Sequence, residues 1–377
     1  MTAPIPLIDL ASQQTRIRGK VDAALTKILD HGQYIMGPEV GQLEADLAEF
    51  SANTHVISCS SGTDALMLAL MALELKPRQA VIVPSFTFAA SAEVLPCLGA
   101  VPIFADIDPV TFNLAPDNLA QAKAAADKAG LECVGIITVG LFGQPADFDQ
   151  INAFASAHGL WVLDDAAQSY GASWNGTSVG HLGSLTATSF FPAKPLGCYG
   201  DGGAVFTQDD NFAEIMRSAR VHGMGRERYS YDRIGMTARL DSMQAAVLIE
   251  KLKIFDDELI ARQRAADFYA EGLKGIVEAP QLAEGATSSW AQYTVKLPAG
   301  ADRDAVQAML KEDGVPSAIY YTKGMHEHPP YAHFPIAEGG LPVTADCCAR
   351  VLSLPMHPYL DEATQTRIIS SLSRAVK

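Results

Sequence analysis

The sequence predicts an α/β fold in which a large domain with a mostly parallel sheet sandwiched by helices precedes a smaller C-terminal α+β domain. Three observations predict this fold. The chain has 377 residues, which is longer than one hydrophobic core usually grows. Short apolar runs alternate with longer helical segments from about residue 40 to residue 210. Further strand-like and helical runs follow a long charged segment that begins near residue 240.

Short apolar runs in the first part of the chain are expected to form the strands of the large sheet. They are HVISCS (55–60), AVIVPS (80–85), VPIFAD (101–106), VGIITV (134–139), LWVLDD (160–165), ATSFF (187–191) and GAVFT (203–207). Helices are expected over 63–75, 115–129 and 147–158. Strands that alternate with helices predict crossover connections and helices on both faces of the sheet. In such sheets, ligands bind outside the carboxyl ends of the strands.

The second part of the chain predicts a smaller domain. Residues 240–274 read as one long, charged, amphipathic helix that bridges the two domains. The later runs are strand-like at 292–297 and 317–321 and helical at 302–312 and 361–375. We place the boundary near residue 255, which divides the chain into a large domain (1–255) and a small domain (256–377).

Composition narrows the classes of partner. The formal net charge is −15 and the pI is about 5.0, so the chain repels nucleic-acid phosphates and anionic membranes, and neither is an expected partner. The N-terminal segment contains Asp9 and no apolar core run, unlike a signal peptide. The six cysteines show no zinc-ligand spacing and are typical of reduced thiols. We therefore expect a soluble cytoplasmic protein without a metal site.

The segment SCSSGTD (58–64) follows a strand-like run and opens a helix. The first N–H groups of a helix are unpaired and lie at the positive end of its dipole, which favours an anion. Gly62 lets the backbone approach a phosphate closely, and Thr63 adds a hydroxyl. The alternative is an ordinary N-cap without a ligand.

Two acids end the run GLWVLDD, and Gln168 follows Asp165 by three residues. A carboxylate buried at the end of a strand needs a partner, and a protonated ring nitrogen is one. Asp165 would then keep a heterocyclic cofactor protonated, with Gln168 near its ring. The alternative is that the acids cap the next helix.

Lys194 lies between Pro192 and Pro195, just after an apolar run. Prolines restrict a loop, and a rigidly held, desolvated lysine is suited to imine formation. Ser189 stands before it as a candidate phosphate ligand. The alternative for a single lysine is a solvated surface residue. The glycines at 197–204 lack the G-x-G-x-x-G order, so a nicotinamide-dependent oxidoreductase is disfavoured.

Two further candidates concern ligand contacts. Phe88, in PSFTF (84–88), would stack on a flat heterocycle, with core packing as the alternative. Arg239 is singled out from a group of arginines because it precedes the long helical segment; surface ion pairs account for most of the group. The group comprises Arg217, Arg220, Arg226, Arg228, Arg233 and Arg239.

Together these segments resemble the DegT/DnrJ/EryC1/StrS family of sugar aminotransferases, which depend on pyridoxal 5′-phosphate (PLP) and have PLP fold type I, like aspartate aminotransferase. The resemblance runs along nearly the whole chain. It is carried by GQYIMGPEV (32–40), SSGTDAL, PSFTF, DDAAQ, SFFPAK and RLDSMQAA.

The resemblance implies a role for each candidate residue. Lys194 carries PLP as a Schiff base and moves protons, and Asp165 pairs with the pyridine nitrogen. Around the cofactor, Gln168 lies beside the ring, Phe88 stacks on it, and Gly62, Thr63 and Ser189 hold the phosphate. The family is homodimeric with shared active sites. Arg239, Tyr321 and His326 fall in segments that approach the substrate, some of them from the partner subunit.

The resemblance also implies the reaction. Glutamate would leave as 2-oxoglutarate, and the amine form of the cofactor (PMP) would aminate the ketone of a nucleotide sugar. SFFPAKPLGCYGDGGA looks most like the branch that acts on UDP-linked 3-keto hexuronic acids, such as UDP-2-acetamido-2-deoxy-3-keto-glucuronic acid. The alternatives are a nucleotide 4-keto-6-deoxy sugar, a dehydratase and a PLP-binding regulator. Some dehydratase relatives have His at the position of Lys194. Thr237 departs from the family, which usually has Asn there to reach the neighbouring subunit's phosphate.

Overall fold

The computed structural model describes residues 5–227 and 229–377. Its largest sheet has seven strands in the order β1-β9-β8-β5-β4-β2-β3. The strands are β1 (His55–Cys59), β2 (Ala80–Pro84), β3 (Val101–Ala105), β4 (Cys133–Val139), β5 (Trp161–Asp165), β8 (Leu185–Ser189) and β9 (Gly203–Thr207). The neighbouring pairs among β3, β2, β4, β5 and β8 are parallel, whereas β9 is antiparallel to both β8 and β1. The predicted mostly parallel sheet is confirmed.

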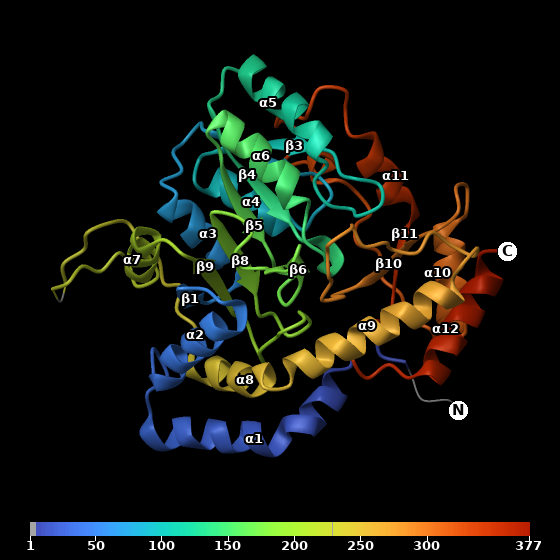
Figure 1. The fold of residues 1–377 in the computed structure, drawn as a ribbon, viewed down its shortest axis with the longest axis horizontal. Coiled ribbons are helices and arrows are strands. Elements are labelled where there is room, and N and C mark those ends of the chain that lie inside the picture. The colour runs from blue at the N-terminus through green and yellow to red at the C-terminus, as the bar shows by residue number, and fades with distance from the viewer. Residues whose placement is uncertain (1–4, 228) are drawn as a thin grey trace.

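Helices cover both faces of this sheet (Figure 1). They are α1 (Leu10–His31), α2 (Pro38–Ser51), α3 (Gly62–Ala72), α4 (Ala89–Cys97), α5 (Leu119–Lys128), α6 (Phe148–His158) and α7 (Asp210–Ala219). The strands are almost wholly buried, and the largest hydrophobic cluster joins them to α3, α4, α5 and α6. None of the described helices is long and apolar enough to cross a membrane.

The single bridging helix predicted over 240–274 is wrong. The structure has two helices, α8 (Ser242–Leu252) and α9 (Phe255–Gly272), and Ile254 between them is not helical, with φ −114° and ψ 3°. Three acids, Asp256 to Glu258, lie in the first turn of α9, where the helix dipole favours negative charge. Lys251 lies in the last turn of α8, so charge favours two helix ends at this point.

The C-terminal part has its own antiparallel pair, β10 (Tyr293–Lys296) with β11 (Val351–Leu354). Around it lie α10 (Arg303–Glu312), α11 (Pro342–Arg350) and α12 (Glu362–Ala375). The strand predicted over 317–321 is wrong: only Ala318 makes a bridge, to Ser353 of β11, whose other edge pairs with β10. A separate hydrophobic cluster unites α9, β10, β11 and α12, on the right of Figure 1.

Some segments cross between the two parts. Ile5 packs into the C-terminal cluster, whereas Met325, Ala337 and Leu341 pack into the core of the large sheet. A domain boundary near residue 255 stays a prediction, but the crossing segments bring residues between 325 and 341 to the large sheet.

Candidate active site

The candidate residues gather at the carboxyl edge of the parallel strands. Asp165 is the last residue of β5, and Ser189 is the last residue of β8. Lys194 lies in the connection from β8 to β9. This connection contains no helix and joins two antiparallel strands. Gly62 begins α3. The edge is where an α/β sheet is expected to bind ligands.

Asp165 is buried and held by two hydrogen bonds. Its Oδ2 accepts from the Ser91 hydroxyl at 2.7 Å, and its Oδ1 accepts from the Ala167 N–H at 3.1 Å. Burial raises the pKa of Asp165, although both hydrogen bonds and the nearby Lys194 charge oppose the rise. The Thr87 hydroxyl lies 3.0 Å from that of Ser91 and extends the network. A cationic partner at this carboxyl would remove the cost of its burial, so the site fits a protonated ring nitrogen.

Asp164, the neighbouring acid, is also buried but faces different partners. The Thr138 hydroxyl donates to its Oδ1 at 3.2 Å, and its Oδ2 has no hydrogen-bond partner among the described residues. Burial and the Asp165 charge raise the pKa of Asp164 to about 7. Asp164 therefore stays largely protonated below pH 7, unlike an ordinary aspartate.

The stability of cofactor-free Asp164→Asn, relative to the natural protein, should increase as the pH rises from 5 to 8. Asp164 has a higher pKa when folded, about 7, than its ordinary value of 3.8, so in the natural protein its contribution falls as pH rises between these values. Asp164→Asn removes this loss, which is at most ~4 kcal/mol. Urea unfolding at pH 5 and pH 8 checks it. An equal difference between the two proteins at both pH values would contradict it.

Lys194 is half-buried in a tight loop. Its backbone N–H donates to the Phe191 carbonyl at 2.8 Å, between the two prolines. Burial lowers the pKa of Lys194, and the Asp165 charge partly offsets this effect. The amine therefore loses its proton more readily than a surface lysine, as imine formation requires.

The start of α3 meets the end of β8 closely. A Cβ atom added to Gly62 would lie 2.6 Å from the Ser189 Cβ, too near for any side chain. The Ser61 hydroxyl accepts from the Asp64 N–H at 3.0 Å and caps the helix, so the N-cap reading is correct for Ser61. Thr63 follows in the first turn. Gly62, Thr63 and Ser189 thus share one corner at a helix N-terminus, the kind of place that accepts a phosphate.

Gly62→Ala should weaken cofactor binding by roughly tenfold or more and destabilise the chain by about 1–3 kcal/mol, because the new methyl group must displace Ser189. Gly41→Ala, in α2, is the matched control: nothing lies within 4 Å of its added Cβ, and alanine is the better helix former. Equilibrium dialysis against PLP and thermal unfolding measure both effects. Equal behaviour of the two variants would contradict the close approach.

The two phenylalanines of PSFTF have opposite environments. Phe86 is fully buried and its ring contacts those of Phe112, Phe142 and Tyr321. Phe88 is 56% exposed and stands directly before α4, the helix that carries Ser91. Core packing is therefore the role of Phe86, and the ring of Phe88 remains available to a ligand.

Gln168 and Tyr321 complete one wall. Gln168 is buried and its Oε1 accepts from the Phe142 N–H at 2.8 Å. Tyr321 hydrogen-bonds with the Gln168 side chain and lies near the Asp165 charge; burial raises the pKa of its phenol. His326 is further along, with its Nδ1 2.7 Å from the Ser85 hydroxyl, just after β2. Residues from the C-terminal half therefore reach the sheet edge.

Arg239 is not joined to the other candidates in this chain. It lies just before α8, and no hydrogen bond or ion pair is found for it within the described residues. The other arginines do not form one site: Arg220 is buried and pairs with Glu44, and Arg228 lies outside the described residues. The Thr237 hydroxyl lies 2.8 Å from His222 Nε2.

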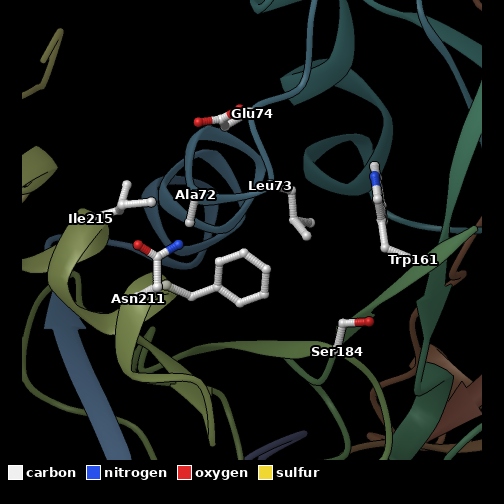
Figure 2. A pocket seen from close by; sticks show the side chains of 8 residues that line it. Ala72, Leu73, Glu74, Trp161, Ser184, Asn211 and Ile215 are labelled. Carbon is white, nitrogen blue, oxygen red and sulfur yellow. The ribbon is translucent and has the colours of Figure 1, made fainter.

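A surface hollow elsewhere is distinct from this site. Figure 2 shows it, lined by Ala72, Leu73, Glu74, Trp161, Ser184, Asn211, Phe212 and Ile215. Trp161 is the first residue of β5 and Ala72 the last of α3, whereas Asp165 and Gly62 stand at the other ends of these elements. The hollow thus lies at the amino edge of the sheet, away from Lys194.

Sequence reasoning missed the residues that hold the site residues in place. Ser91 and Thr87 are four residues apart, the spacing of one helical turn, and this was the only signal that could have linked them. Ser85, which binds His326, and Phe142, which binds Gln168, are far from their partners in the sequence. No local pattern reveals such contacts.

Comparison with known proteins gives a consistent result. The model of the DegT/DnrJ/EryC1/StrS aminotransferase family matches residues 15–373. The UDP-2-acetamido-2-deoxy-3-oxo-D-glucuronate aminotransferase of Pseudomonas aeruginosa is 46% identical, over 98% of this chain and 99% of that protein. A DegT DnrJ EryC1 StrS aminotransferase from Brucella abortus is 48% identical, with a TM-score of 0.95 and 98% of both chains covered.

A second similar solved structure contains a cofactor. NtdA from Bacillus subtilis, with its cofactor PMP bound, is 28% identical, with a TM-score of 0.88, over 100% of this chain and 86% of that one. The family match spans almost the whole sequence, and the fold agrees with it from end to end. The chain therefore belongs to the DegT/DnrJ/EryC1/StrS aminotransferase family.

Proposed function

We propose that this protein is a PLP-dependent aminotransferase that moves an amino group from glutamate to the ketone of a nucleotide-linked sugar, specifically a UDP-linked 3-keto hexuronic acid. The observation that most strongly supports this proposal is the 46% identity to the Pseudomonas aeruginosa enzyme over 98% of this chain. The cluster of Lys194, Asp165 and Gln168 at one edge of the sheet supports it. The product would be an amino sugar for glycan or polysaccharide synthesis.

The residues present fit PLP. A buried carboxyl without a full counter-charge, a corner that a Cβ at Gly62 would fill, and an exposed aromatic ring stand at the same sheet edge. When bound, PLP supplies an electron sink that stabilises negative charge on the carbon next to the transferred nitrogen. Asp165 would hold the ring nitrogen in its protonated form, Phe88 would cover the ring, and Gly62, Thr63 and Ser189 would hold the phosphate.

Lys194 would do the proton chemistry. Burial lowers the pKa of its amine, so it can act as a nucleophile toward the cofactor and afterwards as a base. Once the amino donor has displaced it, the free amine can remove the proton from the donor carbon and return it at the cofactor carbon. Pro192 and Pro195 restrict the loop, which would limit how far the amine moves between these two roles.

We further propose a homodimer whose active sites are completed by the partner subunit. The segments 221–227 and 229–239 extend from the body of the chain beside α7 (Figure 1), and Ile234 and Tyr231 in the second of them are 86% and 58% exposed. Large exposed apolar side chains are typical of an interaction surface. Arg239, at the end of the second segment, has no ion partner among the described residues, so it would be free to serve a second copy. Tyr321 and His326, at the sheet edge, are proposed substrate contacts within each site.

Mixing inactive variants tests the shared site. If Arg239 acts across the interface, equal amounts of Lys194→Ala and Arg239→Ala subunits form mixed dimers in which one of the two sites carries neither change. Random exchange makes half of the dimers mixed, so activity should recover to about a quarter of the natural level. No recovery after subunit exchange, with dimers present, would place both residues in one subunit's site.

The location of the protein is also a proposal. All six cysteines are free, and four of them are buried. Free thiols in an acidic chain are consistent with a reducing cytoplasm, where nucleotide sugars are made. Fractionation of the producing cells tests it.

The absorption spectrum of the purified protein tests the proposed function. After incubation with PLP, a visible band from the lysine-bound cofactor should appear, and glutamate should convert it to a near-ultraviolet band. A UDP-linked 3-keto hexuronic acid should restore the visible band, whereas a 4-keto-6-deoxy sugar should restore it less well. Absence of a visible band would contradict the assignment of Lys194 as the residue that binds PLP. A band that no amino donor changes would favour a dehydratase or a regulator.

A further inference from the structure

Asn113 lies at the centre of a clamp on the loop that follows β4. It is buried, and its Oδ1 accepts from the Leu141 N–H at 2.9 Å. Its Nδ2 donates to the carbonyls of Gln144 and Pro145, both at 3.0 Å. A side-chain amide that binds one N–H and two carbonyls can adopt only one orientation, because the flipped amide would lose every bond. The clamp therefore fixes residues 141–145 as a unit.

Phe142 lies inside the clamped loop in an unusual conformation. Its φ is 60°, a left-handed value that non-glycine residues rarely adopt and that persists only where the surroundings impose it. Its N–H donates to Gln168 Oε1 at 2.8 Å. On the other side of the loop, the Ser289 N–H donates to the Gly143 carbonyl at 3.0 Å, and the Ser289 hydroxyl donates to the Gln168 carbonyl at 2.6 Å. The loop is thus held from both sides.

The Phe142 N–H decides which end of the Gln168 side chain enters the site. A backbone N–H can only donate, so it selects the carboxamide oxygen and leaves the NH₂ group for other partners. Tyr321 is one of those partners, and its phenol is kept protonated because burial raises its pKa. The second hydrogen of the NH₂ group remains for an oxygen atom of a bound ligand.

We propose that Asn113 is a positioning residue: through the 141–145 loop and Phe142 it locks Gln168 in the orientation that presents N–H donors to the active site. The inference rests on the proposed function for its ligand. An oxygen acceptor matches this donor, either the ring oxygen of the cofactor or an oxygen of the sugar. Asn113 is buried and its hydrogen bonds go to Leu141, Gln144 and Pro145, so it would act through the loop and Gln168 and not on the ligand itself.

Asn113→Asp tests the clamp with almost no change in shape. A carboxylate still accepts from Leu141, but it cannot donate to Gln144 and Pro145 and repels their carbonyl oxygens. We expect a fall in kcat/KM of tenfold to 10²-fold, as for a misplaced active-site group. Asn118→Asp is the matched control: Asn118 bonds with Asp106 and Gln121, and no hydrogen bond joins it to the 141–145 loop among the described residues. It should stay within about threefold of the natural protein.

Gln168→Glu tests the orientation itself. The carboxylate keeps the bond from Phe142 but offers an oxygen where the ligand needs a donor, so kcat/KM should fall at least as far as in Asn113→Asp. In the Gln168→Glu background, Asn113→Asp should then add little, because coupled residues do not act additively. A full additional loss in the double variant, or an active Gln168→Glu protein, would overturn the proposal. If the acceptor is an oxygen of the cofactor, the absorption band of both single variants should shift before any substrate is added. If the acceptor is an oxygen of the sugar, the reaction with glutamate should be unchanged and only the reaction with the keto-sugar should slow.

A measurement without cofactor separates this inference from the proposed function. The full chain is labelled with 3-fluorotyrosine, and the ¹⁹F signal of Tyr321 is assigned by its loss in Tyr321→Phe. Because Tyr321 binds Gln168, that signal should move in Asn113→Asp and stay in place in Asn118→Asp. This result needs neither PLP nor activity. An unmoved signal in Asn113→Asp would show that the clamp does not control Gln168.

Discussion

Replacing Lys194 by alanine should reduce transamination by at least about 10⁴-fold and remove the visible band of the lysine-bound cofactor. The chain then lacks both the nucleophile that holds the cofactor and the base that moves the proton, and each of these contributes several orders of magnitude in comparable enzymes. Burial also lowers the pKa of Lys251, to about 8, but Lys251 lies in the last turn of α8 over the Tyr199 ring and has Glu258, not Asp165, as its acid partner. Stopped-flow absorption with glutamate measures the half-reaction.

The control for this variant is Lys253→Ala. Lys253 is exposed, follows α8 and pairs with Glu250, so its loss should leave the spectrum and the rate unchanged. Lys194→Ala should not be less stable than the natural cofactor-free protein, because burial of a charged amine disfavours the folded state. Persistence of the visible band in Lys194→Ala would show that another amine binds the cofactor.

The large domain could be predicted from the sequence because its signal is local. Each central strand is an apolar run, buried on both faces, and Gly62, Asp165 and Ser189 stand at the ends of such elements. Once the sheet is parallel, these ends must share an edge. The positions of Asp165 and Lys194 followed from this rule together with the resemblance to a family.

The remaining parts depend on contacts between distant residues. The break at Ile254 is favoured by Lys251 at the end of α8 and by the acids 256–258 at the start of α9. The amphipathic pattern of the sequence continues through this point and gives no sign of the break. The segment expected to be a strand over 317–321 has suitable residues, and Ala318 bridges Ser353 on the edge of β11 that β10 leaves open, but the chain then turns toward Gln168. The partners of the site residues, such as Ser91 for Asp165 and Asn113 for the 141–145 loop, are set by tertiary packing, which one sequence does not show.

The pair Asp164 and Asp165 supports a second prediction with a large effect, since one substitution can be compared at two neighbouring positions. Asp165→Asn should lower the rate by roughly 10²–10³-fold, the loss that follows removal of one preorganised electrostatic contact. Asparagine has the same shape and can still accept from Ala167, but it is neutral and cannot hold the cofactor ring nitrogen in its protonated form. The absorption band of the bound cofactor should shift for the same reason.

Asp164→Asn should stay within about threefold of the natural rate, because Asp164 bonds to Thr138 on the sheet and, with a pKa of about 7, is largely neutral below pH 7, as asparagine is. Both variants remove one buried carboxyl from β5, so a loss of fold or of sheet packing would affect them alike. Only a direct role at the cofactor separates them. Single-turnover rates with glutamate and with the keto-sugar decide the matter: equal losses at the two positions would mean that Asp165 acts through the sheet, and a loss confined to Asp165→Asn would place its charge at the reacting ring.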